Sequence, residues 1–304
     1  MRARRPQLRF SAPADGSEAA PPPITSRENH SLKRFRAALA GNSGEPNVIG
    51  IEGPHLVEEA LRSGVEILAV LASPAGEKHL DGLGLAGLVA KPSPGARILR
   101  TSDRLFASAA ATDSPQGIAV LVRLPEYSFE DVVRGLALAV VLVGVQDPGN
   151  VGTLVRSAEA LGASGMVAAE GTANPFGPKA MRASAGSAFR LPILVRAQPP
   201  VLLAQLRAAG LKLVAATAAS AGPGPHPVSP DQVDFRGPIA LLVGSESRGL
   251  PESILRSADA AVRIPVAAPV ESLNAAIAAS VILYEAARQR SASDAERPEG
   301  ETTR

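Results

Sequence analysis

Short apolar runs alternate with helical patterns along most of the chain. In its first part the spacing predicts helices over 29–39, 54–62 and 103–110, and strands over 47–51, 67–72, 98–101 and 117–124. Ser26 precedes the first of these helices and is expected to be its N-cap. Strands and helices that alternate over about a hundred residues are typical of a small α/β domain.

A second alternation begins at residue 140, where the apolar, β-branched run 140–143 predicts a buried strand. A glycine-rich turn follows, and apolar residues at helical spacing from Val151 to Leu161 then predict a helix. Further strands are expected over 165–169, 191–195, 212–216, 239–243 and 262–266, and helices over 201–209 and 273–288. The last helix carries one largely apolar stripe, made of Leu273, Ile277, Ser280, Val281 and Tyr284.

These patterns divide the chain into five segments. They are a disordered basic tail (1–23), a first domain (24–124), a linker or short helix (125–138), a second domain (139–289) and a disordered polar tail (290–304).

Composition narrows the classes of function. The chain has no Cys, and its four His are scattered without metal-ligand spacing, so no disulfide, thiolate nucleophile or metal site is expected. The net charge of +2 says little, because partners depend on where charge is clustered. Neither a secretion signal nor an apolar run of the ~18 residues that span a membrane is visible, so a cytoplasmic protein is expected.

Polar residues follow the two most apolar strands of the second domain. After 140–143 come Asn150 and, on the next helix, Arg156, which projects away from the apolar stripe. The strand 239–243 ends in a glycine-bounded turn that carries one carboxylate, Glu246. Ser272 and Asn274 stand at the start of the last helix, where free N–H groups favour polar or anionic partners. Each residue also has a structural interpretation, since Asn150 and Ser272 could be helix caps and Glu246 a solvated charge.

Three segments then occur in order: 149–156 (GNVGTLVR), 244–250 (GSESRGL), and 264–265 (IP) with 271–274 (ESLN). Together they resemble the three motifs of the SpoU (TrmH-like) family of S-adenosylmethionine-dependent RNA ribose 2′-O-methyltransferases, in the SPOUT superfamily. The resemblance covers about residues 140–288. Residues 24–123 resemble, more loosely, the L30e-like substrate-binding domain that often precedes this catalytic domain.

The resemblance implies an α/β fold with a parallel sheet and a trefoil knot that forms the methyl-donor pocket, beside which two subunits pair. It places catalytic polar groups at Asn150, Arg156, Glu246, Ser272 and Asn274. It places donor contacts, largely from the backbone, at Gly244, Ile264 and Leu273, with a wall formed from Thr217 onward, over 217–224. The third motif departs from the family's commonest form at Val266 and Ala268, where methionine and glycine are usual.

The implied reaction is an in-line displacement at the donor's methyl carbon by a ribose 2′-oxygen, which requires neither a metal nor a covalent intermediate. Arg156 is the family's activator of the hydroxyl, but a guanidinium with a pKa above ~12 is a poor base. We therefore expect Arg156 to hold the target phosphate and to stabilise the developing alkoxide. Asn150 would orient Arg156 or the ribose, and Glu246 would order the arginine.

The appended domain and the 174–187 segment favour ribosomal RNA, and within it the 23S species, as substrate. A tRNA substrate and a non-catalytic RNA-binding or assembly factor are the alternatives. A Rossmann-type enzyme is excluded, because no Gly-x-Gly-x-x-Gly follows a strand. Residues that could contact RNA phosphates are basic or titratable: Arg27, His30, Lys33, Arg34, Lys179 and Arg182.

Overall fold

The computed structural model describes residues 21–85 and 97–295, with side chains to residue 292. Most of the predicted basic tail and the end of the predicted C-terminal tail lie outside the described residues. The chain divides into two compact units, Met1–Glu126 and Tyr127–Arg304. Each unit has its own sheet and its own core, and each is considered by itself.

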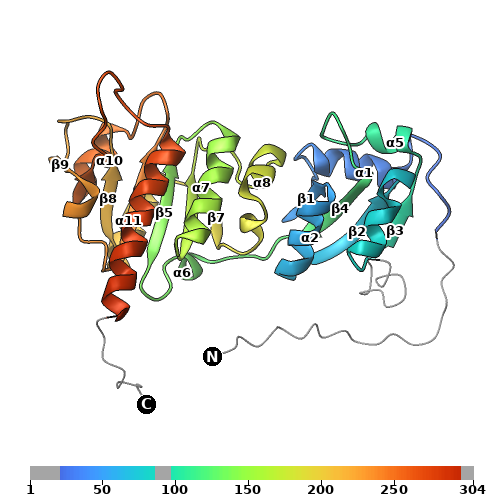
Figure 1. Ribbon diagram of the computed structural model, residues 1–304, viewed down its shortest axis with the longest axis horizontal. Coiled ribbons are helices and arrows are strands. Elements are labelled where there is room, and N and C mark those ends of the chain that lie inside the picture. The colour runs from blue at the N-terminus through green and yellow to red at the C-terminus, as the bar shows by residue number, and fades with distance from the viewer. Residues whose placement is uncertain (1–20, 86–96, 296–304) are drawn as a thin grey trace, which may run out of the picture. The chain divides into compact units, whose positions relative to one another are not determined.

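The N-terminal unit is built on a four-stranded sheet in the order β1-β4-β2-β3. β4 is antiparallel to both β1 and β2, and β3 is parallel to β2. The strands are β1 (Val48–Glu52), β2 (Glu66–Ala72), β3 (Arg97–Arg100) and β4 (Ile118–Arg123). The helices are α1 (His30–Leu39), α2 (Pro54–Ser63), α3 (Glu77–Gly82) and α5 (Asp103–Ala107), with a 3-10 turn, η1, at Pro74–Gly76. The predicted strands and helices of this part are thus confirmed, with their ends shifted by a few residues (Figure 1).

The start of α1 corrects one prediction. Asn29, and not Ser26, is the N-cap, because the Asn29 side chain accepts hydrogen bonds from the N–H groups of Ser31 and Leu32. Ser26 instead accepts from the backbone of Glu28 in the preceding turn. Both residue types make good caps, and only the register of the apolar face distinguishes them.

The C-terminal unit is built on a seven-stranded, wholly parallel sheet in the order β7-β6-β5-β10-β8-β11-β9. The strands are β5 (Leu138–Val143), β6 (Gly165–Ala169), β7 (Ile193–Ala197), β8 (Lys212–Ala216), β9 (Pro227–Val228), β10 (Ile239–Gly244) and β11 (Ala260–Val262). The helices are α6 (Phe129–Val132), α7 (Pro148–Ala160), α8 (Pro178–Ser184), α9 (Pro199–Ala208), α10 (Glu252–Ser257) and α11 (Ala275–Ala295), with 3-10 turns η2 (Ser187–Phe189) and η3 (Pro230–Gln232). The predicted α/β fold with a parallel sheet is confirmed.

Helices cover both faces of this sheet. On one face, α6, α9 and α10 pack against alternate strand residues such as Val141 and Leu242, both fully buried. On the other face α7 and α11 lie side by side (Figure 1). Strands buried on both sides read as continuous apolar runs, which explains the composition of β5 and β10.

The end of the sheet corrects a second prediction. The strand expected over 262–266 is β11, which ends at Val262. Pro265 has no N–H to donate to a sheet ladder, and the chain then runs without regular structure to residue 274. That irregular segment carries the third motif.

Two segments outside the predicted domains contain helix. The short helix expected as one alternative for 125–138 is α6, which begins with a capping box formed by Ser128 and Asp131 and whose Val132 is buried. α11 continues to Ala295, beyond the predicted end at residue 288. Its last turns are fixed by Arg290, which donates to the carbonyl groups of four residues in the loops before β5 and β10: Leu136, Ala137, Phe235 and Gly237.

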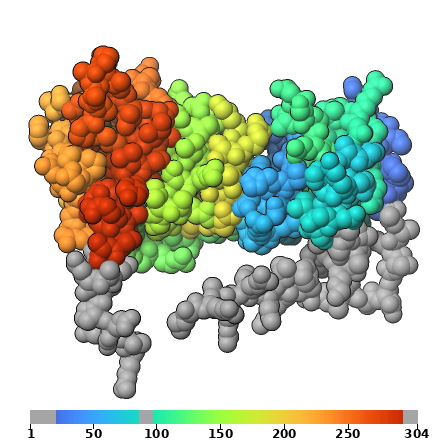
Figure 2. All heavy atoms as spheres, in the orientation of Figure 1, coloured from blue at the N-terminus to red at the C-terminus, as the bar shows by residue number. Residues whose placement is uncertain are grey.

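The apolar stripe predicted for the last helix is not its buried face. Ile277, Val281 and Tyr284 are 54%, 40% and 61% exposed, whereas Ala279 and Leu283 are fully buried. The helix is apolar on both sides, and its small side packs against α7 and β10. Figure 2 shows α11 at the surface of the C-terminal unit. Among the described residues, no helix is both long and apolar enough to span a bilayer.

Candidate active site

The site lies where β5 and β10 end. These neighbouring parallel strands are in register to Val143 and Gly244, so the loops that follow them share one edge of the sheet. The first loop leads into α7 and carries Asn150, and the second carries Glu246. The N-terminus of α11 brings Asn274 to the same place.

Side-chain hydrogen bonds join the three residues, which we call the Asn150 cluster. The Nδ2 of Asn150 donates to Oε1 of Glu246 at 2.7 Å, and the Nδ2 of Asn274 donates to Oδ1 of Asn150 at 3.1 Å. The partners of Asn150 lie 96 and 124 residues away in the sequence. Both ends of the Asn150 amide are therefore used, and its orientation is fixed.

The structural interpretation of Asn150 as a helix cap is wrong. The cap of α7 is Asp147, whose Oδ1 accepts the Asn150 N–H at 3.0 Å, while its Oδ2 accepts from the Nζ of Lys179 at 2.8 Å. The hydrogen bond from Lys179, with the backbone N–H of Asn150, holds the pKa of Asp147 below its usual value. Asp147 was not predicted, although an Asp directly before a Pro at a helix start is a capping signal.

The carboxylate of Glu246 is kept ionised by its neighbours. Burial alone would raise its pKa, but hydrogen bonds from the Asn150 amide and from the backbone N–H groups of the loop lower it more. One of them comes from the N–H of Gln146 to Oε2 at 3.4 Å. The cluster thus presents a fixed negative charge at the edge of the sheet.

Asn274 both joins the cluster and caps α11. Its Oδ1 accepts from the N–H groups of Ala276 and Ile277 at 2.9 and 3.2 Å, which leaves its amide group free to bind Asn150. This explains why the helix begins at residue 275 and not at residue 273. Asn274 also holds the cap role that the structural interpretation gave to Ser272.

Arg156 and Ser272 remain outside the cluster's hydrogen bonds. Arg156 is exposed on α7, and within the described ranges its guanidinium forms no hydrogen bond or ion pair. Ser272 is exposed in the segment before α11. An arginine with no internal partner is available to bind an external anion such as a phosphate.

The residues predicted to contact the donor lie at the end of β10 and in the loops that follow β8 and β11, three adjacent strands. Thr217 and Ile264 are half-buried, and Leu273 is 36% exposed. In the part of the chain that the structure describes, the backbone groups of Ile264 and Leu273 form no hydrogen bond with other backbone groups. These free amides and carbonyls fit a ligand that is held largely by the backbone, as the resemblance implies.

Two glycines of the motifs lie where the neighbouring backbone leaves no room for a side chain. A Cβ on Gly244 would lie 2.2 Å from the carbonyl carbon of Gly249, because the loop folds back on itself through two Ser245–Gly249 hydrogen bonds. A Cβ on Gly152 would lie 2.3 Å from the carbonyl oxygen of Ala180 on α8. The sequence indicated small residues here but not which neighbours require them.

The predicted RNA-contacting residues differ in availability. Arg34 is held by Glu45 through two hydrogen bonds of 2.6 and 2.9 Å, and Lys33 pairs with Glu28 at 2.5 Å. Lys179 is paired with Asp147, as described above. Arg27, His30 and Arg182 are exposed and form no ion pair among the described residues.

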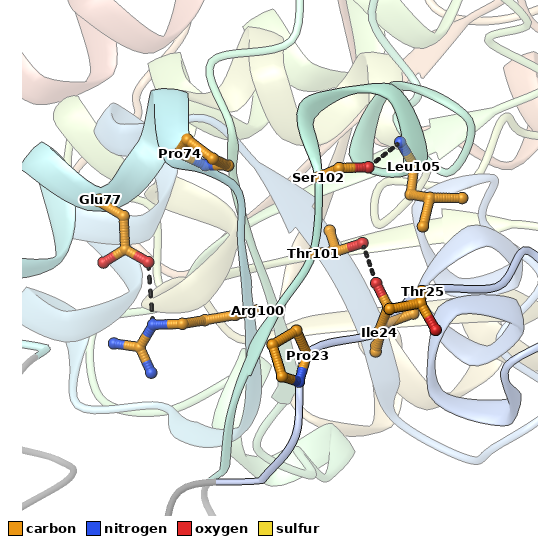
Figure 3. Close-up of a pocket in the computed structure, with 9 residues that line it drawn as sticks. All are labelled: Pro23, Ile24, Thr25, Pro74, Glu77, Arg100, Thr101, Ser102 and Leu105. Carbon is orange, nitrogen blue, oxygen red and sulfur yellow. Dashed lines mark hydrogen bonds and ion pairs between the residues drawn. The ribbon is translucent and has the colours of Figure 1, made fainter.

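A separate cavity of about 470 Å³ lies in the N-terminal unit, between the start of the described chain and the loops around β3 (Figure 3). Several of its polar side chains already form hydrogen bonds or ion pairs within the unit. Arg100 pairs with Glu77 at 3.0 Å, and the Thr101 hydroxyl donates to the carbonyl of Ile24 at 3.1 Å. No predicted site residue lines it. Across the described ranges, no group of acidic or histidine side chains could hold a metal ion.

Comparison with known proteins defines the class to which this fold and site belong. Residues 137–284 match the model of the SpoU rRNA Methylase family, and residues 45–120 match that of the MRM3-like substrate binding domain. The chain is 34% identical, over 86% of its length, to the Bacillus subtilis 23S rRNA (guanosine(2553)-2′-O)-methyltransferase RlmP, of which it covers 97%. This chain belongs to the SpoU rRNA methylase family.

Solved structures support the same assignment to this family. An AdoMet-bound rRNA methyltransferase from Sinorhizobium meliloti aligns over 88% of this chain and 97% of its own, with a TM-score of 0.74 and 31% identity. The SpoU methyltransferase AviRb from Streptomyces viridochromogenes, in complex with AdoMet, aligns over 86% of this chain and 98% of its own, with a TM-score of 0.73 and 28% identity. The family predicted from the three motifs and the α/β fold with a parallel sheet are confirmed.

Proposed function

We propose that this protein transfers a methyl group from S-adenosylmethionine to a ribose 2′-hydroxyl of 23S ribosomal RNA. The Asn150 cluster carries the proposal, because it joins the three family motifs at one edge of the sheet in a chain of this family. The relatives with assigned substrates support ribosomal over transfer RNA: RlmP acts on guanosine 2553 of 23S rRNA, and a 35% identical Streptomyces viridochromogenes enzyme acts on uridine 2479.

The chain's own groups would supply positioning and electrostatics. S-adenosylmethionine, when bound, supplies a methyl group already activated by its sulfonium. The free backbone groups of Ile264 and Leu273, with Thr217, would hold it beside Gly244. In the transfer, the bond from the 2′-oxygen to the methyl carbon forms, the carbon–sulfur bond breaks, and the hydroxyl proton passes to solvent or phosphate.

Arg156 would bind the phosphate next to the target ribose and stabilise negative charge on the 2′-oxygen. A guanidinium stays protonated at neutral pH, so its contribution is electrostatic. The Asn150 cluster would orient the ribose, with Ser272 as a further polar contact. Alignment of nucleophile, carbon and sulfur by such groups lowers barriers by about 7–11 kcal/mol in favourable cases.

Substitution of Arg156 by Ala tests this assignment. We expect transfer of tritiated methyl groups from the donor to ribosomal RNA to fall by about 10²-fold or more, because one charge at the transition state is lost. The affinity for the donor, measured by calorimetry, should stay unchanged. Equal loss of both would show that Arg156 is structural. Maps of ribose methylation in ribosomal RNA from cells with and without the gene would identify the target, and unaltered maps would overturn the proposal.

We propose further that the protein is a homodimer that pairs through α11. Ile277, Val281 and Tyr284 give one exposed apolar stripe on this helix, and Val270, in the irregular segment before the helix, is also 53% exposed. The same α11 brings Asn274 to the site, so the interface would lie beside it. The trefoil knot implied by the resemblance is part of the same proposal and concerns the segment 263–275.

Light scattering at micromolar concentration tests the dimer. Ile277→Asp should give a monomer with an intact far-ultraviolet spectrum, because a charge would be buried in the interface. Val201, 58% exposed on α9, gives the matched control, and Val201→Asp should leave the mass of the particle unchanged. A monomeric natural protein would contradict the proposal.

A further inference from the structure

The segment between β8 and β9, residues 217–226, has little to hold its shape. It is rich in Ala, Gly and Pro, it is largely exposed, and it contains no helix or strand. Such a loop carries few apolar side chains to pack and would pay a large entropy cost on ordering. It nevertheless includes the predicted donor wall, so its conformation bears directly on donor binding.

One residue outside the loop donates hydrogen bonds to the start of the loop and to the strand that follows it. The Nε of Arg263 donates to the carbonyl of Ala218 at 2.8 Å, two residues after β8. The backbone N–H of the same residue donates to the carbonyl of Val228, in β9, at 2.9 Å. Arg263 stands directly after β11, which lies between β8 and β9 in the sheet.

Three other contacts fix the same loop without side-chain charge. The Thr217 N–H donates to the Val262 carbonyl at 3.0 Å, and the Thr217 hydroxyl accepts from the Ala219 N–H at 3.1 Å. Gly224 lies so close to α10 that a Cβ there would be 2.3 Å from the carbonyl oxygen of Leu255. The loop is thus held at its start by Arg263 and near its end by close backbone packing.

We infer that Arg263 is a positioning residue for the donor: its side chain holds the 217–226 loop in the conformation that forms one wall of the donor pocket. The inference rests on the proposed function for the identity of the ligand. The role is indirect, because the Arg263 guanidinium donates to a backbone carbonyl of the loop, whereas the Arg156 guanidinium has no such partner among the described residues. A loop that is already ordered loses less conformational entropy when the donor binds, so the affinity for the donor is higher.

Amide hydrogen exchange on the unliganded protein is the first test. Arg263→Met keeps the apolar stem of the side chain and removes the guanidinium that donates the hydrogen bond. Amide exchange across 217–226 should then rise about tenfold relative to the natural protein, as the loss of one charged hydrogen bond implies. Arg62→Met is the matched control, since among the described residues the Arg62 guanidinium pairs with acidic neighbours one turn away on α2. Unchanged exchange in Arg263→Met would overturn the inference.

Donor affinity, measured by calorimetry, is the second test. S-adenosylhomocysteine and 5′-methylthioadenosine share the adenosine, but only the first has a carboxylate. If Arg263 acts through the loop, Arg263→Met should weaken both ligands by the same factor, about tenfold, and Arg263→Lys should recover part of the loss. Weakening of S-adenosylhomocysteine alone would show a direct ion pair and overturn the inference.

Gly224→Ala disturbs the same loop from its other end and should reproduce the loss for both ligands. If the natural protein bound neither ligand, the proposed function would fail, while the exchange measurement on the unliganded protein would still decide whether Arg263 holds the loop.

Discussion

At the scale of single residues, the charge of Glu246 gives the site a dependence on pH. Its pKa lies below the ordinary value of 4.5, because hydrogen bonds from Asn150 and backbone N–H groups outweigh the effect of burial. Because the pKa is lowered in the folded protein, the ionised carboxylate stabilises the fold at pH values above the ordinary pKa. This contribution disappears as the pH falls through the lowered pKa. Glu246→Gln should therefore cost about 0.5 kcal/mol near neutral pH, as for other exposed polar pairs.

Thermal unfolding of the natural protein and Glu246→Gln over a range of pH checks this. The two melting temperatures should differ at neutral pH and converge as the pH falls below about 4. A difference that persists or grows in acid would mean that the carboxylate is protonated in the folded protein.

The sequence predicted which polar residues would meet, and it missed how they are held. Asn150, Glu246 and Asn274 could be found because each belongs to a motif with several fixed positions. Asp147 and Arg263 act through contacts with residues 32 and 45 positions away, and no local pattern reports such a partner. The cap assignments at Ser26 and Ser272 failed for a related reason, since Ser26, Asn29, Ser272 and Asn274 are all good caps and only the packed helix decides between them.

At the scale of elements, the crossing of α7 and α8 depends on one glycine. A Cβ on Gly152 would lie 2.3 Å from the Ala180 carbonyl oxygen and 2.6 Å from the Ala183 Cβ, so the helices would have to separate. Gly152→Ala should lower the free energy of unfolding by about 1–3 kcal/mol. It should also reduce methyl transfer, because α7 carries Asn150 and Arg156.

Denaturant titration of Gly152→Ala beside Gly82→Ala isolates the packing effect. Gly82 ends α3 with open space around it, so alanine there should be neutral or stabilise by up to about 1 kcal/mol. Equal stability of both variants would show that α7 and α8 can separate at no cost.

The elements themselves were largely predictable, and their faces were not. Apolar periodicity placed the strands of both sheets within a few residues, except for the two-residue β9, which it did not predict. On α11 it selected Ile277, Val281 and Tyr284, whereas the core takes the smaller Ala279 and the neighbouring Leu283. A helix that is apolar on both sides has two candidate faces, and the choice depends on the close approach of α7, which the sequence of α11 does not contain.

At the scale of the whole molecule, the chain should unfold in two steps. Its two units have separate cores: Leu71 is fully buried among residues of the N-terminal unit, and Leu242 among those of the C-terminal unit. The same substitution in each core, Leu71→Ala and Leu242→Ala, should cost about 2–5 kcal/mol. Each should lower the midpoint of one calorimetric transition and leave the other in place, because units with their own cores unfold independently.

The same pair of variants separates the tasks of the two units. If the N-terminal unit recruits RNA and the C-terminal unit binds the donor, Leu71→Ala should lose affinity for ribosomal RNA at temperatures above its own transition while the donor affinity is unchanged. Leu242→Ala should lose both donor binding and transfer as its transition is passed. A single transition that both variants shift equally would contradict the division of labour, since stability would then be shared by the whole chain and neither core could be assigned to one ligand.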